Sequence, residues 1–143
     1  MLYGGFDHTV DKKGRIFIPA RFREDLGESF MISASLFSQD ALWAMSKQSW
    51  NTLVEKVAAV PGKEGSALRQ YLFDRAFSVE YDAQGRILIP AKLRSETDIQ
   101  NEAHVVGMNS YVEIWGAEQW SKTQAENTFE NIVDISDKYG LSL

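Results

Sequence analysis

The chain has 143 residues, a formal net charge of −5 at pH 7, and 44% hydrophobic and 24% charged residues, which is ordinary for a soluble globular protein. It contains no cysteine, which excludes disulfides, thiol catalysis and cysteine-based metal sites, and which fits a cytoplasmic protein. No apolar run approaches the roughly 20 residues that cross a bilayer, and no signal-peptide pattern opens the chain, so we expect an intracellular protein with no membrane partner.

Two segments of the chain repeat one another. Residues 6–24 and 77–95 are identical at nine of 19 aligned positions. A first strand is predicted at the start of each copy, over residues 6–10 and 77–81, where aromatic and β-branched residues concentrate. The repeat therefore indicates two tandem units of one fold.

An Asp-x-x-Gly-Arg sequence follows the first strand in both units. It reads DKKGR over residues 11–15 and DAQGR over residues 82–86. Gly14 and Gly85 are predicted to make the bend, because glycine adopts positive φ without steric cost. A turn needs a glycine and a polar residue but no arginine, so the repeated arginine indicates a function beyond turn formation.

Further strands and a short helix are predicted after each turn. Apolar strands are expected over residues 16–18 and 87–89, and Pro19 and Pro90 are each expected to open a short helix. Two more strands are predicted in each unit, near residues 30–34 and 41–45, and near 103–107 and 111–115. A unit of this size cannot close a core alone. We therefore expect the units to intertwine about a pseudo-two-fold axis that sets both turns on one face.

Helices are predicted between and after the units. Apolar spacing from Trp50 to Val57 indicates one buried helical face, and Pro61 ends that helix. A second helix is expected around residues 68–72. A last helix is expected from about residue 117 to 133, with three side chains turned inward: Phe129, Ile132 and Val133.

Basic residues concentrate around the two turns. Residues 11–23 hold five basic residues and one acidic residue, and residues 82–94 hold three and one. Such islands can attract an anion on an acidic chain, because salt screens charges beyond about 8 Å. Arginine bonds a guanine edge or grips a phosphate, and a two-stranded ribbon fits the major groove of DNA. The predicted DNA contacts are Arg15, Arg86, Lys12, Lys13, Arg21, Arg23, Lys92 and Arg94, with Asp11 and Asp82 orienting the two turn arginines.

Two other functions are weaker candidates. In a ring-forming interaction protein, the basic turns would pair with acidic patches of neighbouring subunits, and DNA binding would be incidental. An enzyme acting on an anionic substrate would need a nucleophile, a general base or a metal site. His8 and His104 are the only histidines and lack paired ligand spacing, and residues 61–66 fail the Walker A pattern. We therefore predict no catalytic residue, no cofactor and no metal.

The segments "DKKGRIFIPARFR" and "DAQGRILIPAKLR", with the "LW…W" and "EIW…W" closures of the two units, resemble the MraZ family of bacterial proteins. The resemblance extends almost from the N-terminus to Trp120. It implies an α+β fold in which two tandem AbrB/SpoVT-like swapped-hairpin units form one intertwined β-barrel with flanking helices. The expected domains are a first unit (5–47), a helical connector (48–75), a second unit (76–119) and a C-terminal helix and tail (120–143).

The same resemblance implies a function. MraZ proteins are transcriptional regulators, mainly repressors, that bind direct repeats in the promoter of their own division and cell-wall gene cluster. The implied partners are double-stranded DNA and further copies of the chain in a closed ring, and the implied location is the cytoplasm at the nucleoid. Arg15 and Arg86 become the leading DNA contacts, supported by Lys13. The second unit has Ala83-Gln84 in place of Lys12-Lys13, so equal participation of the two units stays open.

Overall fold

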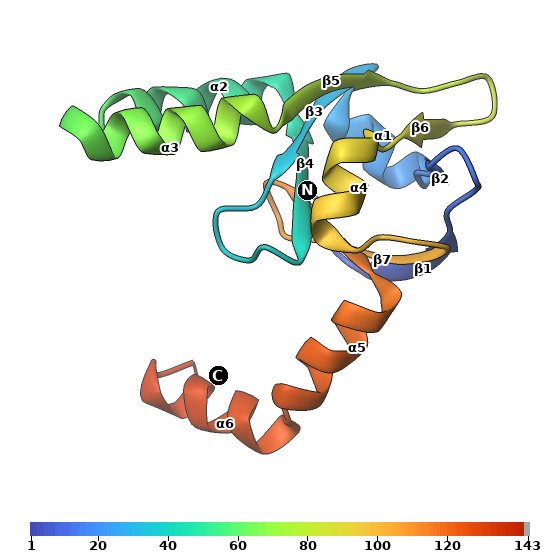
Figure 1. Cartoon of the computed structure of the whole chain (residues 1–143). Coiled ribbons are helices and arrows are strands. Elements are labelled where there is room, and N and C mark those ends of the chain that lie inside the picture. Colours follow the sequence, from blue (N-terminus) through green and yellow to red (C-terminus); the bar gives the residue numbers. More distant parts are fainter. Residues whose placement is uncertain (142–143) are drawn as a thin grey trace.

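The computed structural model describes residues 1–141, which form an α+β fold (Figure 1). Its strands are β1 (Gly5–Thr9), β2 (Arg15–Phe17), β3 (Ser29–Ala34), β4 (Ala41–Ser46), β5 (Ala76–Glu80), β6 (Arg86–Leu88), β7 (Glu102–Gly107) and β8 (Val112–Gly116). Its helices are α1 (Ala20–Leu26), α2 (Lys47–Ala58), α3 (Gly62–Asp74), α4 (Ala91–Thr97), α5 (Ala117–Glu126) and α6 (Phe129–Lys138). The strands predicted from the repeat are confirmed to within one or two residues at their ends.

Six strands form one antiparallel sheet in the order β1-β7-β8-β4-β3-β5, and β2 and β6 form a separate two-stranded ribbon. The units exchange strands: β1 of the first pairs with β7 of the second, and β5 of the second pairs with β3 of the first. This exchange confirms that the two units intertwine. The predicted β-barrel is wrong, because β1 and β5 remain the two edges of an open sheet. The chain leaves each edge strand through a turn into the ribbon, and the two ribbon strands pair with each other.

The core lies between the sheet, the ribbon and the short helices α1 and α4. Ile16 and Ile87 face each other in the ribbon and are almost completely buried. Phe22 and Leu26 line the inner face of α1, as their four-residue spacing predicts. Burial of each such side chain stabilises the fold by about 1.5–3 kcal/mol. The ribbon that carries the turns is therefore fixed to the main core through its isoleucines.

The prolines stand at the starts of the two short helices, one position earlier than predicted. Pro19 and Pro90 are the N-cap residues of α1 and α4, with φ of −58° and −54°. Both have extended ψ values, so each ends the ribbon strand and directs the chain into the helix. Neither helix is closed by a side-chain cap at this end.

Helices α2 and α3 form a hairpin that projects from the sheet (Figure 1). Val57 and Leu72 are its most deeply buried apolar residues. Arg69 Nη1 donates to the carbonyls of Val57 and Val60 at 3.3 and 3.2 Å, which satisfies the C-terminal end of α2. None of the described helices is both long enough and apolar enough to span a bilayer.

The C-terminal region differs from its prediction. Instead of one helix to residue 133, α5 ends at Glu126 and α6 begins at Phe129, because Thr128 caps α6 by accepting from the Asn131 amide at 3.2 Å. The expected inward orientation is wrong as well: the side chains predicted to be buried are exposed, to 81% at Phe129, 49% at Ile132 and 39% at Val133. Of the predicted tail, residues 142 and 143 lie outside the described residues.

Candidate nucleic-acid interface

The ribbon brings the two Asp-x-x-Gly-Arg turns together. Strands β2 and β6 are antiparallel, with Arg15 opposite Leu88 and Phe17 opposite Arg86. Each turn is also tied to the opposite unit, because the Gly14 carbonyl accepts from the Ile89 amide at 2.9 Å and the Gly85 carbonyl from the Ile18 amide at 3.1 Å. The sequence prediction that the turns lie side by side is confirmed.

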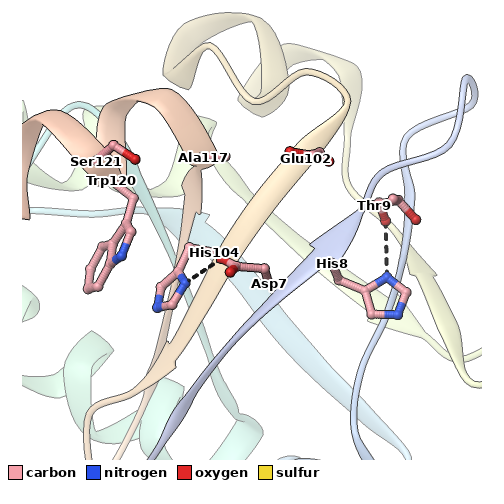
Figure 2. Close-up of a pocket in the computed structure, with 8 residues that line it drawn as sticks. All are labelled: Asp7, His8, Thr9, Glu102, His104, Ala117, Trp120 and Ser121. Atoms are coloured by element: carbon pink, nitrogen blue, oxygen red, sulfur yellow. Dashed lines mark hydrogen bonds and ion pairs between the residues drawn. The ribbon is translucent and has the colours of Figure 1, made fainter.

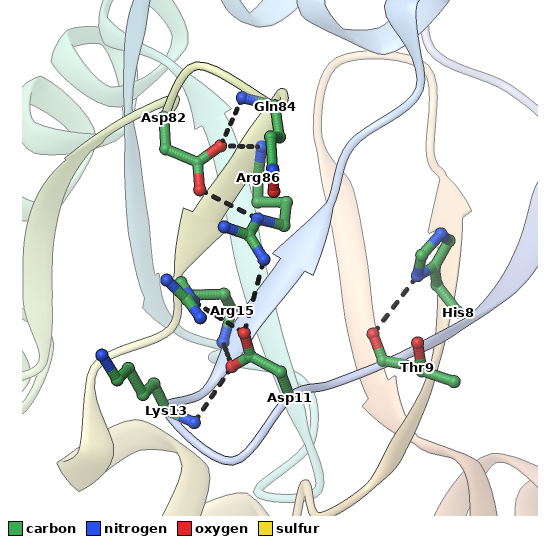
Figure 3. Close-up of polar contacts among 8 residues, drawn as sticks. All are labelled: His8, Thr9, Asp11, Lys13, Arg15, Asp82, Gln84 and Arg86. Atoms are coloured by element: carbon green, nitrogen blue, oxygen red, sulfur yellow. Dashed lines mark hydrogen bonds and ion pairs between the residues drawn. The ribbon is translucent and has the colours of Figure 1, made fainter.

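The carboxylate of Asp11 organises the first turn (Figure 3). Its Oδ1 accepts from the backbone amides of Lys13 and Arg15 at 3.0 and 2.9 Å. Its Oδ2 accepts from Arg15 Nε at 2.6 Å. Gly14 has a φ of 91°, which an L side chain rarely adopts. One aspartate thus fixes both the backbone of the turn and the direction of its arginine.

Asp82 organises the second turn in the same way (Figure 3). Its Oδ1 accepts from the amides of Gln84 and Arg86, both at 2.9 Å, and its Oδ2 accepts from Arg86 Nε at 2.9 Å. Gly85 has a φ of 77°. Arg86 makes one further contact, between its Nη1 and Oδ2 of Asp11 at 3.6 Å. The two turns therefore have the same backbone geometry. One ion pair between the units, from Arg86 to Asp11, links them.

Both turn carboxylates are held in their charged form. The backbone N–H of Arg15, assisted by its side chain and opposed by partial burial, lowers the pKa of Asp11 to about 2. The pKa of Asp82 is also lowered, first by the backbone N–H of Arg86. Each arginine uses Nε for its own aspartate. The terminal nitrogens of Arg15 have no hydrogen-bond partner within residues 1–141, so they are available to an external acceptor.

Two of the predicted DNA contacts, Arg94 and Arg23, lie against the turn glycine of the other unit. A Cβ added to Gly14 would lie 2.5 Å from Cζ of Arg94, whose Nε donates to the Ile89 carbonyl at 3.2 Å. A Cβ added to Gly85 would lie 3.2 Å from Cζ of Arg23. Each guanidinium therefore braces the opposite turn, a contact that no sequence spacing indicated.

Arg23 is held further by aromatic rings. Its Cζ lies 5.5 Å from the ring centre of Phe17 and 5.9 Å from that of Tyr81, within cation–π range. Its Nε is buried without a hydrogen-bond partner among the described residues. Burial raises the pKa of Tyr81 to about 12, against an opposing effect of Arg23. These contacts fix Arg23 inside the fold, and its contact with DNA stays a prediction.

The remaining basic candidates divide into two pairs. Lys12 and Lys13 are exposed on the first turn, beside Arg15. Arg21 lies over the ring of Tyr3, at 5.7 Å, and Lys92 forms an ion pair with Asp74 at 2.6 Å. Arg21 and Lys92 thus have neighbours outside the two turns. DNA contact stays a prediction for all four.

The histidines lie in a separate hollow of about 680 Å³ beside α5 (Figure 2). His104 Nδ1 lies 2.8 Å from Asp7 Oδ1, and its ring stacks on Trp120 with centres 4.1 Å apart. His8 Nδ1 lies 3.2 Å from the carbonyl of its neighbour Thr9. Within residues 1–141 no three His, Asp or Glu side chains are arranged to hold a metal ion.

Comparisons with known proteins agree over nearly the full length of the chain. The family model described as "MraZ protein, putative antitoxin-like" matches residues 1–70 and 72–137. A protein of Caldanaerobacter subterraneus named "Transcriptional regulator MraZ" is 36% identical over 145 residues, covering 99% of this chain and 100% of the relative. Proteins of the same name from Pelotomaculum thermopropionicum and Limosilactobacillus reuteri are 40% and 37% identical, with 94% and 96% of each chain covered.

Proposed function

Because this chain belongs to the MraZ family, a family of transcriptional regulators and not of enzymes, we propose that it is a sequence-specific DNA-binding regulator. In this proposal it acts in the cytoplasm at the nucleoid. It represses the division and cell-wall gene cluster by binding direct repeats in its own promoter. The paired Asp-x-x-Gly-Arg turns make the contact with DNA.

The observation that carries the proposal is the pairing of Arg15 and Arg86 on one ribbon. Each guanidinium is held at Nε by an aspartate of its own turn, which leaves terminal nitrogens for a base edge or a phosphate. A two-stranded ribbon fits the major groove, which is about 12 Å wide, and carries side chains to the base edges there. Holding the arginines before binding reduces the entropy that the contact costs.

The other basic residues support this contact in different ways. Lys12 and Lys13 extend the first turn toward phosphates, whereas the second turn has no lysine at the matching positions. Arg23 and Arg94 act mainly by bracing the turns, and Arg21 and Lys92 make peripheral contacts with phosphates. The first turn therefore supplies more of the electrostatic attraction than the second.

Self-assembly completes the proposal. The two units, residues 5–47 and 76–119, are AbrB/SpoVT-like swapped hairpins. A helical connector (48–75) joins them, and a C-terminal segment (120–143) follows. A closed ring of copies presents several turn pairs to successive repeats. Linked sites bind at high effective concentration, so weak contacts of single copies sum to a stable complex.

A mobility-shift experiment with promoter repeats tests the proposal. Wild type and the double variant Arg15→Ala/Arg86→Ala are compared at equal concentration, and the assembled mass of each is measured in parallel. The proposal predicts that the double variant keeps its mass and loses the shift. Unchanged binding would exclude the turns as the DNA contact. Loss of the assembled mass would instead favour the alternative function, in which the turns join subunits of an interaction protein.

A further inference from the structure

Helix α6 presents an apolar face that nothing in the described chain covers. Figure 1 shows α6 standing clear of the sheet and of the α2–α3 hairpin. Phe129, Ile132, Val133 and Ile135 are 39–81% exposed, and no residue of α6 is buried. An isolated helix shorter than about 12 residues is marginal in water, and α6 has 10. This helix therefore needs a surface that covers its apolar face.

The polar face of α6 is acidic. Glu130 and Asp137 lie at the edge of the apolar face, next to Val133, and Asp134 lies on the opposite side; Lys138 is the only basic residue of the helix. An anionic lipid surface would repel this face, whereas helices that lie on membranes usually carry lysine and arginine there. The charge pattern favours a protein surface with a basic group at its rim.

One surface hollow of this same chain has the matching chemistry. It lies between α2, strand β4 and the β3–β4 and β7–β8 loops, and it has a volume of about 310 Å³. We call it the aromatic groove and define it by Phe37, Trp43, Met45, Leu53, Lys56 and Tyr111.

The aromatic groove is apolar at its centre and basic at one point. Phe37 and Tyr111 flank Trp43, with ring centres 5.1 and 5.4 Å from the Trp43 ring. Phe37 is 77% exposed, which is unusual for a phenylalanine of a folded chain. Lys56 is the one charged side chain that lines the groove, and it forms no ion pair within residues 1–141.

We propose that α6 of one copy docks in the aromatic groove of a second copy. Phe129, Ile132 and Val133 follow the i, i+3, i+4 spacing by which an amphipathic helix fills an apolar groove. The acidic edge of α6, formed by Glu130 and Asp137, then lies beside Lys56. The contact is heterologous, since the helix of each copy meets the groove of the next, and such contacts generate rings when the rotation closes.

This inference rests on the self-assembly in the proposed function and names the surfaces that make it. A matched pair of variants tests it by measurement of native mass, with circular dichroism as the check of folding. Ile132→Asp removes the apolar contact from an exposed position of α6. Lys138→Gln changes the net charge by the same amount on the polar face. We expect Ile132→Asp to reduce the assembly to the 16.2 kDa chain, and Lys138→Gln to keep the wild-type mass.

Mixing two defective chains gives the sharper test. Phe37→Asp damages the groove and leaves α6 intact, while Ile132→Asp damages α6 and leaves the groove intact. Each is expected to be a monomer alone. Together they can make one junction only, so we expect a 1:1 pair that grows no further. Failure of the two monomers to pair would overturn the docking. So would a wild-type mass for either single variant, or a helix α6 that folds back onto the groove of its own copy.

The outcomes separate this inference from the proposed function. A wild type that is itself a monomer would overturn both the ring and the docking. An assembled wild type that Ile132→Asp leaves unchanged would overturn the docking alone. Binding of a single-repeat duplex by the Ile132→Asp monomer would show that the DNA contact is independent of α6.

Discussion

The guanidinium Nη1 of Arg86 lies 3.6 Å from the carboxylate of Asp11, which belongs to the other unit. The same carboxylate oxygen accepts from Arg15 Nε at 2.6 Å. Asp82 has no matching contact with Arg15 within the described residues, and Arg86 is the only arginine that it pairs with there. The two turns are therefore coupled, and the coupling passes through the first aspartate.

This asymmetry predicts different effects of two equivalent substitutions. Asp11→Asn removes the charge that both arginines share, so we expect the side chains of Arg15 and Arg86 both to become more mobile. Asp82→Asn should affect Arg86 alone. The measurement is the NMR relaxation of the arginine Nε groups in each variant. Equal and local effects of the two substitutions would contradict the coupling.

The lowered pKa of Asp11 predicts an acid limit for the first turn. A carboxyl group whose pKa is lower in the folded state contributes stability above its unfolded pKa, near 4, and loses that contribution as pH falls through the folded value. For Asp11 the folded value is about 2, so the stability contribution should decline between about pH 4 and 2, while the turn itself keeps its geometry until Asp11 protonates near pH 2. The check is the chemical shift of the Gly14 and Arg15 amides against pH. An Asp11 titration midpoint near 4 would contradict this prediction.

The bracing arginines predict an effect that crosses between units. Arg94→Ala should increase hydrogen exchange in the first turn, around Gly14, because its guanidinium lies against that glycine. Arg23→Ala should increase exchange in the second turn, around Gly85. Lys92→Ala is the control, since Lys92 pairs with Asp74 and touches neither turn glycine. Faster exchange confined to the unit that carries the substitution would contradict the bracing.

The close contact of Arg94 with Gly14 predicts a loss of stability when a single methyl group is added at Gly14. Gly14→Ala places a Cβ at positive φ, which costs roughly 1–2 kcal/mol, and presses it against Arg94. Gly62 also has positive φ, but nothing lies within 4 Å of its added Cβ. Gly62→Ala therefore measures the backbone strain alone. We expect Gly14→Ala to lower the free energy of unfolding more than Gly62→Ala, as measured by denaturant unfolding. Equal losses would show that Arg94 moves away without cost.

Much of the fold could be predicted because the repeat and the local pattern agree. The Asp-x-x-Gly-Arg sequence specifies its turn through local hydrogen bonds, and the apolar strands predicted over residues 16–18 and 87–89 carry Ile16 and Ile87, which are buried in the core. A chain of two half-units must share a core, so the intertwining of the units also followed. The pairing of Arg15 with Asp11 followed from their four-residue separation in the turn.

Other features depend on contacts that no local pattern encodes. The positions of Arg23 and Arg94 behind the opposite turns result from the exchange of strands, whereas the sequence predicted both only as DNA contacts. The sheet stays open because the ribbon strands pair with each other, which the strand pattern alone does not decide. The break before α6 did have a local indication: Thr128, three residues before Asn131, is a good N-cap residue.

The most direct test of the paired-turn interface is the salt dependence of DNA affinity. Wild type and Arg15→Ala/Arg86→Ala are titrated with a duplex that carries the promoter repeats and with a scrambled duplex, at several salt concentrations and at equal assembled mass. If the arginines grip phosphates, the plot of log affinity against log salt should be less steep for the double variant, by about 0.9 in slope for each lost contact. If the arginines read bases, the double variant should no longer prefer the repeat duplex over the scrambled duplex. A double variant that keeps both the slope and the preference would contradict the account.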